Sequence, residues 1–284
     1  MKKIDFNEYR FRCSSLGTIM TGVKGGLTDK QKTLFNDLDK RYKGEGRPLT
    51  DNQRKIHAEL LAKKELTPKL SQTVTSYLEK LFKEEVTGKR TDIETDAIWK
   101  GRIAEESSIT LYSNFVNEPF FKNSERRSND FITGEPDNVD GKIRDVKTSW
   151  NLDTFPMFEI GCPNNGYWWQ LQGYMELWDI DEAELIYCLV DTPNEMIEDA
   201  KRRFCWRRNY IDIPEEDEKR IESNMTFYDI PEQFRVRIFD VKRDKEAIVR
   251  LYAQIELCRD YLNKLNKQLY NEEDKTPITQ LGNA

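Results

Sequence analysis

Three charged side chains that could act together on a phosphate stand in one short stretch of this chain. Asp137, Asp145 and Lys147 lie within Gly134–Lys147, which reads GEPDNVDGKIRDVK. Gly141 marks a turn between two short strands, so we expect a hairpin that brings Asp137 to Asp145. Converging carboxylates repel one another unless a hard cation such as Mg²⁺ or Mn²⁺ lies between them. With a lysine beside them, they predict a site where water attacks a phosphate.

The strand expected at 143–148 decides which of these side chains share a face. Successive side chains of a strand point to opposite faces, so Asp145 and Lys147 lie together while Val146 enters the core. The hairpin therefore places both polar groups on one surface of a sheet.

A helix expected at 95–115 precedes the hairpin and has one apolar face. It contains Gly101 and, one turn later, Glu105, which we expect over the hairpin as a further ligand of a metal ion or a water molecule. Glycine inside a helix costs about 1 kcal/mol relative to alanine, so Gly101 predicts close packing or a close ligand. An ordinary helix with no such role is the alternative.

A second, aromatic-rich helix is expected at 167–179. It places Gln170 and Tyr174 one turn apart on the same face. The uncharged amide of Gln170 can bind a phosphate oxygen or a water without competing for a cation. The alternative is that the aromatic side chains of this helix only fill the core.

Two basic segments are candidates for binding a phosphate backbone. Near the N-terminus, Arg12, Ser14 and Ser15 precede a helix start, where free backbone amides favour anions; an ordinary capped helix explains them equally well. Later, the run 201–208 interleaves cations with aromatic residues and would suit a phosphate backbone and an unstacked base. A surface helix paired with neighbouring acids is the equal alternative. The arginines of this run are Arg202, Arg203, Arg207 and Arg208.

Between Gly25 and Gly88 the chain is rich in lysine and repeats a leucine–threonine opening, at Thr28, Thr50 and Thr67. Each opening suits a helix N-cap, and each following segment has one apolar face, so three helices are expected. We expect the lysines on solvated faces, with a DNA track as the alternative.

The remaining pattern predicts an α/β fold. Short strands are expected at 115–121, 129–135, 183–190 and 234–241. A long closing helix is expected at 243–271, and the tail after Glu272 is expected to be disordered.

Composition narrows the class of protein. The chain has 284 residues, of which 34% are charged, and a net charge of −6, which argues against non-specific adhesion to nucleic acid but leaves local basic patches open. Five scattered cysteines suggest reduced thiols in a cytoplasmic, soluble protein, and no apolar run is long enough to span a membrane. The single histidine, His57, excludes a multi-histidine zinc site, and we expect it to be solvated.

Glu105, Asp137, Asp145-Val146-Lys147 and Gln170-x-x-x-Tyr174 stand in an order that resembles the PD-(D/E)XK nuclease superfamily. Within it, the chain is similar to the phage lambda exonuclease and the YqaJ-like viral recombinases. Ala97 to Gly101 resembles the tryptophan-glycine segment of that family, and Tyr167-x-x-Gln170-x-Gln172 resembles its glutamine helix.

The resemblance implies a restriction-endonuclease-like core, a mixed central β-sheet flanked by helices, built from 1–22 and 93–284. It also implies an inserted helical lobe at 23–92 and a long C-terminal helix. Glu105, Asp137, Asp145 and the carbonyl of Val146 would bind one or two Mg²⁺ ions, for which Mn²⁺ can substitute.

The resemblance also assigns roles to the remaining side chains. Lys147 would orient or activate the attacking water and offset charge on the phosphorus, while Gln170 would position the water or the phosphate. The residues expected to contact DNA or phosphate are Arg12, Ser14, Ser15, Gln172, Tyr174 and the four arginines of the run 201–208.

In function, the resemblance implies a phage or prophage exonuclease that degrades linear double-stranded DNA from a free end for recombination. An endonuclease on the same core and a catalytically inert DNA-binding protein are the alternatives. Expected partners are DNA, a single-strand annealing protein and further copies of the chain, in the cytoplasm of a bacterial host. Two departures stand out, since Glu135 replaces a hydroxyl residue that helps bind a terminal phosphate and Asp145 replaces the commoner glutamate.

Overall fold

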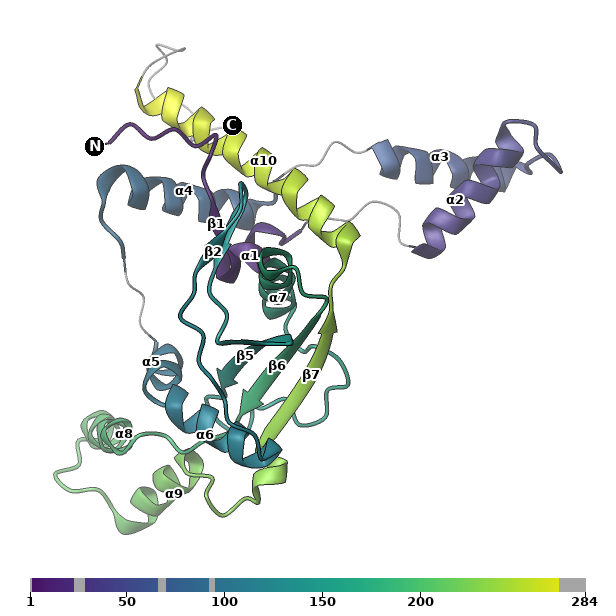
Figure 1. The fold of residues 1–284 in the computed structure, drawn as a ribbon. Helices are drawn as coiled ribbons and strands as arrows, with labels where there is room; N and C mark the ends of the chain where they lie inside the picture. The colour runs from purple at the N-terminus through teal and green to yellow at the C-terminus, as the bar shows by residue number, and fades with distance from the viewer. Residues whose placement is uncertain (1, 23–28, 66–69, 92–94, 271–284) are drawn as a thin grey trace. The chain divides into compact units, whose positions relative to one another are not determined.

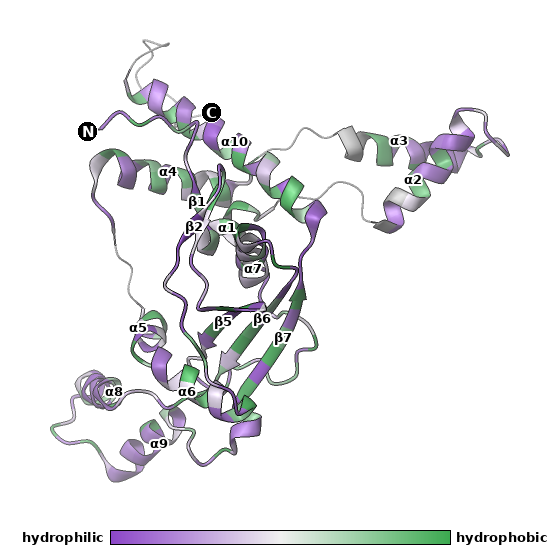
Figure 2. Ribbon diagram, in the orientation of Figure 1, coloured by the Kyte–Doolittle hydropathy of each residue, from purple (hydrophilic) through white to green (hydrophobic). Residues whose placement is uncertain are grey.

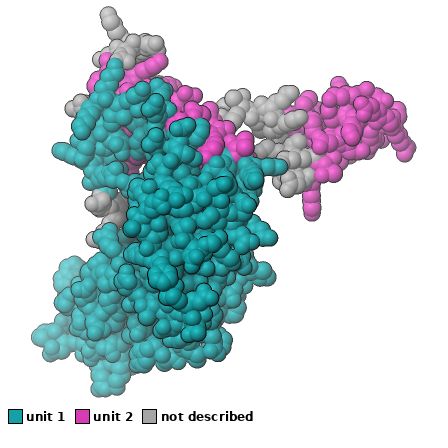
Figure 3. Space-filling model, viewed as in Figure 1, with its two compact units in different colours: residues 1–17, 83–248 teal, residues 18–82, 249–284 magenta. Residues whose placement is uncertain are grey.

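A computed structural model describes residues 2–22, 29–65, 70–91 and 95–270. The chain divides into two compact units (Figure 3). The first comprises residues 1–17 and 83–248, and the second comprises 18–82 and 249–284. The boundaries between the units fall inside three helices, α1 (Leu16–Ile19), α4 (Gln72–Thr87) and α10 (Lys245–Leu269). The predicted division into a core and an inserted lobe uses other boundaries and stays a prediction.

The first unit is built on a four-stranded mixed sheet with the order β4-β5-β6-β7, of which Figure 1 labels β5, β6 and β7. β5 and β6 are parallel, and the other neighbouring pairs are antiparallel. A smaller sheet has the order β1-β3-β2. The strands are β1 (Phe11–Arg12), β2 (Arg127–Ser128), β3 (Ile132–Gly134), β4 (Asn138–Asp140), β5 (Lys142–Thr148), β6 (Glu182–Cys188) and β7 (Val236–Lys242).

Alternation along the strands gives the main sheet two different faces. Val146, Ile186 and Ile238 pair in register and pack on one face with side chains of α6 (Glu105–Val116). Fully burying an aliphatic side chain of this size stabilises the fold by about 1.5–3 kcal/mol. Asp145 and Lys147 point to the opposite face, where α7 (Asn165–Trp178) contacts β5 and β6. The expected direction of Val146 into the core is thus confirmed.

The expected helix at 95–115 is interrupted. It forms α5 (Asp96–Ile103) and α6, separated at Ala104, whose backbone angles φ −93° and ψ 9° are not helical. The strand expected at 115–121 is wrong, because α6 runs to Val116 and ends at Asn117 in a left-handed conformation with φ 55°. The apolar residues that suggested a strand, Val116 and Phe120, instead pack against the core behind α6.

The rest of the first unit follows β6. α8 (Asn194–Arg208) and α9 (Glu215–Met225) form a pair of helices with mostly hydrophilic residues (Figure 2), and the short helix η2 (Glu232–Phe234) leads into β7. The strands expected at 129–135 and 234–241 are present with shorter or shifted bounds.

The second unit is helical in its described part. α2 (Asp29–Tyr42) and α3 (Asp51–Glu65) pack through Phe35, Leu38, Leu49 and Leu60. Thr50 caps α3 as predicted: its hydroxyl accepts from Gln53 N at 3.3 Å, and Gln53 Oε1 accepts from Thr50 N at 3.1 Å. The predicted caps Thr28 and Thr67, like the tail after Glu272, lie outside the described residues.

The solvated histidine expected from the sequence is wrong. His57 is 4% exposed, stacks between the rings of Phe35 and Tyr42, and places Nε2 3.1 Å from Asp39 Oδ1. The packing of α2 on α3 covers a side chain that the polar sequence around it placed in water. Within the described ranges, no helix combines the length and apolar character that a membrane crossing requires.

Candidate active site

The candidate site forms where β4 and β5 part. β4 pairs with β5 only from Asp140 to Asn138, around a turn at Gly141 with φ 67°. Asp137 comes one residue before β4. Its side chain, in place of a backbone carbonyl of a neighbouring strand, accepts the hydrogen bond from Val146 N, with 2.7 Å between Val146 N and Asp137 Oδ2. The predicted hairpin is therefore confirmed, and it brings Asp137 to the edge of β5.

Asp145 and Lys147 meet on the α7 face of β5. Asp145 is 2% exposed, and Lys147 Nζ lies 2.5 Å from its Oδ2. This ion pair occupies the buried oxygen, so Lys147 holds the carboxylate that a cation would otherwise contact. A buried carboxylate paired with a lysine in this way is common at functional sites, where a ligand can rearrange the pair.

Gln170 reaches the same carboxylate from α7. Its Nε2 donates to Asp145 Oδ1 at 3.3 Å and lies 2.9 Å from the hydroxyl of Tyr174. The two α7 side chains, one turn apart as predicted, thus lie beside the acids. Tyr174 is 5% exposed and supports Gln170 from below, so direct contact of Tyr174 with DNA, which the resemblance implied, does not fit its burial.

Glu105, the first residue of α6, lies near enough to Asp137 for its charge to act on that carboxyl group. Burial, together with the negative charges of Asp145 and Glu105, raises the pKa of Asp137 to about 7, while Lys147 and Val146 N oppose the shift. Glu105 itself is bound by Lys122, with 2.5 Å between Oε1 and Nζ. No sequence pattern pointed to Lys122, because it lies in an irregular segment whose position only the fold decides.

The donor set fits a hard divalent cation. Among the residues that the structure describes, no three histidine, cysteine or acidic side chains are placed to hold a metal ion together, and Lys122 and Lys147 bind two of the acids of this site. Yet Asp137 has a raised pKa, and the negative charge of the buried Asp145 adds to that shift. Both features indicate negative charge that a cation would offset, and oxygen ligands are those that Mg²⁺ prefers.

Lys147 remains charged despite its burial. Burial by itself lowers the pKa of Lys147, but the adjacent carboxylates of Asp145 and Asp137 outweigh this and raise it. The ammonium also lies over the ring of Tyr167, 4.8 Å from its centroid. Tyr167 stands one turn before Gln170, so the aromatic helix pattern contained this contact, although the pattern alone assigned Tyr167 no role. The protonated amine of Lys147 can therefore stabilise a negatively charged group beside it, but it cannot accept a proton as a base.

The N-terminal segment packs directly beside this centre. In the helical turn η1 (Cys13–Ser15), Cys13 lies against α7 and β3: a Cβ added to Gly134 would come 2.7 Å from Cys13 Sγ and 2.6 Å from the Tyr174 ring. Ser15 Oγ donates to the carbonyl of Arg12 at 2.7 Å. The side chains of Arg12 and Ser14 are exposed, and within the described chain neither forms a side-chain hydrogen bond or ion pair, so both are available to an anion.

Glu135 does not present a free negative charge beside Asp137. Its Oε2 lies 2.9 Å from Arg126 Nη2. Glu135, which stands where the related family has a hydroxyl residue, is thus paired with an arginine from the segment before β2. This pairing reduces the repulsion between Glu135 and a phosphate.

The predicted DNA contact of Gln172 is wrong. Gln172 is 0% exposed, its Nε2 donates to the carbonyl of Lys242 at 2.8 Å, and its Oε1 accepts from Asp244 N at 2.8 Å. Both ends of the amide therefore hold the end of β7 against α7. The adjacent Gln170 points the other way because residues two apart in a helix do not share a face.

The arginines of α8 separate into two groups. Arg202 pairs with Asp199, and Arg203 pairs with Asp96 and Asp199, so acids occupy both, as the surface-helix alternative predicts. Lys201, of the same run, is buried among three glutamates. Arg207 and Arg208 remain exposed, the latter stacked on Phe204 at 5.2 Å.

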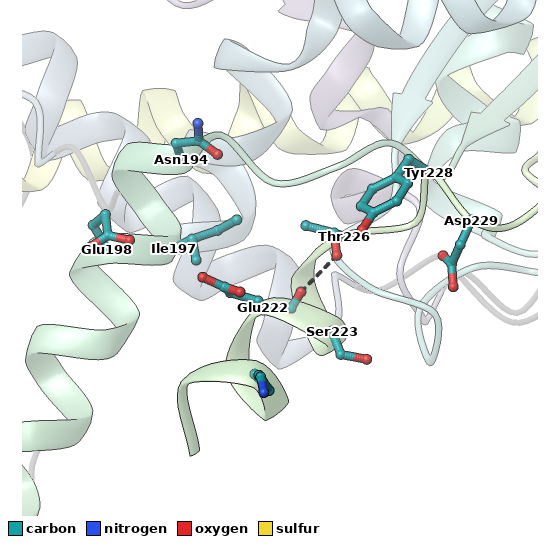
Figure 4. A pocket seen from close by; sticks show the side chains of 9 residues that line it. Asn194, Ile197, Glu198, Glu222, Ser223, Thr226, Tyr228 and Asp229 are labelled. Atoms are coloured by element: carbon teal, nitrogen blue, oxygen red, sulfur yellow. Dashed lines mark hydrogen bonds between the residues drawn. The ribbon is translucent and has the colours of Figure 1, made fainter. Parts of the chain in front are cut away.

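A cavity of about 330 Å³ lies between α8, α9 and the segment that follows α9 (Figure 4). Its lining includes Glu198, Glu222 and Tyr228, and the hydroxyl of Thr226 donates to the Glu222 carbonyl at 2.9 Å. The cavity is lined by none of the residues of the candidate site around Asp145 and Lys147, so it is a separate feature of the first unit.

The fold matches solved structures of exonucleases. A phage-related exonuclease from Haemophilus somnus 129PT matches with a TM-score of 0.63 and 24% identity, over 92% of this chain and 97% of that one. An alkaline exonuclease, LHK-Exo from Laribacter hongkongensis, matches with a TM-score of 0.54 and 11% identity over 94% of both chains. The same enzyme in complex with dAMP matches with a TM-score of 0.55 and 11% identity, over 93% of this chain and 92% of that one.

No family model and no curated protein matches the chain. The structural matches confirm the expected mixed α/β nuclease fold with flanking helices and a long C-terminal helix.

Proposed function

We propose that this chain is a Mg²⁺-dependent deoxyribonuclease that hydrolyses phosphodiester bonds from the ends of linear double-stranded DNA. The observation that carries the proposal is the convergence of Asp137, Asp145, Lys147 and Gln170 at the edge of β5, where a buried and a half-buried carboxylate lie beside one ammonium group. The likeness in fold to proteins described as exonucleases supports the choice of DNA ends over internal sites.

Asp137, Asp145 and the carbonyl of Val146 would hold the cation, with Glu105 joining them once it leaves Lys122. A cation bound there supplies Lewis-acid polarisation of the phosphate and lowers the pKa of a bound water. Charge pairing with Asp145 keeps Lys147 protonated beside the reacting phosphate, where it offsets the negative charge that develops on the phosphoryl oxygens. Gln170, fixed by Tyr174, orients the water or a phosphate oxygen.

The proposed biological role is phage or prophage recombination in the cytoplasm of a bacterial host. A single-strand annealing protein and further copies of this chain are the proposed partners. The likeness in fold to an exonuclease described as phage-related supports this role. Mn²⁺ is expected to substitute for Mg²⁺, because both take oxygen ligands.

The substrate is tested by incubating the protein and Mg²⁺ with end-labelled linear duplex DNA and with covalently closed circular duplex. We expect the linear DNA to be degraded and the circles to persist, and EDTA to stop the reaction. Nicked circles would favour an endonuclease on the same core. Absence of cleavage with Mg²⁺ and Mn²⁺ would leave an inert DNA-binding protein.

Lys147 is tested by Lys147→Ala, with Lys142→Ala as a matched control on the same strand. Lys142 pairs with Glu184 and lies away from Asp145, so its removal should leave cleavage unchanged. Loss of Lys147 should lower the cleavage rate by at least about 10²-fold, the range for removing one preorganised charge partner, while DNA affinity stays close to wild type. Cleavage by Lys147→Ala at the parental rate would refute the site.

A further inference from the structure

The register of the main sheet places a second cation in line with Lys147. Lys147 of β5 pairs with Tyr187 of β6, which pairs with Arg237 of β7. Paired residues of neighbouring strands point to the same face, and two strand spacings amount to about 10 Å. Arg237 therefore lies on the face that carries Asp145 and Lys147, two strands away from Lys147.

Aromatic rings connect the two cations. The Tyr167 ring, beneath Lys147, has its centroid 6.2 Å from that of Tyr187, and Tyr187 lies 6.0 Å from Phe239. The guanidinium of Arg237 lies 5.5 Å from the Phe239 centroid. Tyr187 and Phe239 are 8% and 3% exposed, so these rings pack in the core and fix the positions of the two cations on one face of the sheet.

Arg237 is not neutralised by an acid in the described part of the chain. Its Nη2 donates to the backbone carbonyl of Glu159 at 2.6 Å, and its Nε is buried without a hydrogen-bond partner. Arg144 and Arg243 of the same unit, by contrast, each bind carboxylates. The guanidinium of Arg237 is half-buried and has no acidic partner, and such a group is suited to a phosphate.

The loop that Arg237 contacts exposes unusually large apolar side chains. On either side of Glu159, Phe158 is 88% and Ile160 is 101% exposed. The carboxylate of Glu159 accepts from Phe158 N at 3.1 Å, so it is turned toward its own backbone. Phe155 is 5% exposed and anchors the loop. The loop joins the strand of Lys147 to the helix of Gln170, which makes this surface continuous with the candidate site.

We infer that Arg237 and Phe158 form a subsite for an unpaired nucleotide of the DNA strand next to the cleavage site. Arg237 binds the phosphate, and Phe158 stacks on the base. Aromatic stacking accepts any base, so the subsite would select single-stranded character and no particular sequence. The inference rests on the proposed nuclease function, because it assigns the surface to the same substrate.

The test measures binding of a short fluorescein-labelled single-stranded oligonucleotide by anisotropy in EDTA, where cleavage is stopped. Arg237→Gln should weaken binding about tenfold and make the plot of log affinity against log salt less steep by about 0.7, the amount for one phosphate contact on a single strand. Arg237→Lys should restore the salt slope. Lys242→Gln, an exposed lysine of β7 on the opposite face, is the control and should match wild type.

Phe158→Ala should weaken binding roughly tenfold without changing the salt slope, and Phe158→Trp should preserve the affinity. Phe234→Ala removes another exposed phenylalanine of the unit and should have no effect. The subsite is overturned if Arg237→Gln binds with the wild-type affinity and slope. It is also overturned if Phe158→Ala leaves binding intact but changes the mass of the protein in solution, which would mark a protein interface.

Cleavage of linear duplex by the wild type is measured in parallel. If the wild type cleaves and Arg237→Gln binds as the wild type does, the subsite is removed and the nuclease proposal stands. No cleavage with either metal removes the nuclease proposal, whatever the binding data.

Discussion

Ionisation of Asp137 in the candidate site lowers the stability of the folded chain. Its pKa rises from 3.8 to about 7 in the folded chain, first through burial and then through Asp145 and Glu105. An acid whose pKa is raised by folding favours the folded state most when it is protonated, so stability falls as the pH rises from about 4 through about 7. Above this pH, the ionised Asp137 is an unfavourable charge that a bound cation would compensate.

Asp137→Asn should therefore be more stable than the wild type and inactive. In EDTA at about pH 8 we expect a gain of about 1–3 kcal/mol in the free energy of unfolding, shrinking to nothing by about pH 4. Denaturant titrations across this pH range measure the difference, and Asp140→Asn, an exposed acid on the same hairpin, is the control.

The same pair of proteins reports on the cation. Mg²⁺ should raise the melting temperature of the wild type, because a ligand that binds only the folded state stabilises it, and should leave Asp137→Asn nearly unchanged. An Asp137→Asn variant that is less stable than the wild type at about pH 8 would contradict the assignment of unfavourable charge to this carboxylate.

Among the elements, the hairpin was predictable and the helix before it was not. Gly141 and the alternation of 143–148 are local signals, and β4 and β5 follow them. The break at Ala104 has no comparable signal: Gly101 lies in the helix three residues earlier, and alanine and glutamate at the break itself favour a helix. It matters because it starts α6 at Glu105 and places that carboxylate in the first turn, where the helix dipole favours negative charge.

Gly101, in α5, tests whether a ligand approaches this helix. The sequence predicted close packing or a close ligand, but a Cβ added there meets no atom within 4 Å. Gly101→Ala should therefore stabilise the fold by about 0.5–1 kcal/mol through helix propensity. Thermal unfolding and cleavage are measured together. A stabilised variant that no longer cleaves would indicate DNA at this position, and a destabilised one would contradict the open surroundings of Gly101.

Across the part of the molecule that the structure describes, many basic side chains form ion pairs with nearby acids and do not gather into an extended basic surface. The net charge is −6, and many cations of the first unit bind acids, as in Lys201, Arg202 and Arg203. The basic run of α8 predicted a phosphate track, yet its neighbours neutralise half of its arginines. Among the residues predicted or inferred to contact DNA, those in the described part of the first unit that no acid pairs are Arg12, Arg207, Arg208 and Arg237.

Duplex DNA binding should consequently depend only moderately on salt. We expect a slope of about −3 to −4 in log affinity against log salt between about 50 and about 300 mM, the value for three or four phosphate contacts. Anisotropy with labelled duplex in EDTA measures it. A slope steeper than about −6 would contradict this count and would favour the lysines between Gly25 and Gly88 as a DNA track, the alternative that the sequence left open.

Local sequence was enough to establish the order of the polar groups, the hairpin at Gly141 and the face shared by Asp145 and Lys147, because turns and strand alternation are set by neighbouring residues. The assembled fold was needed to show that Lys122 binds Glu105, that Gln172 holds the end of β7 and that His57 is buried. These contacts join segments that are distant in the sequence and meet only in the folded chain, so local periodicity does not predict them. The two positions most relevant to the proposed substrate, Arg237 and Phe158, belong to this second kind.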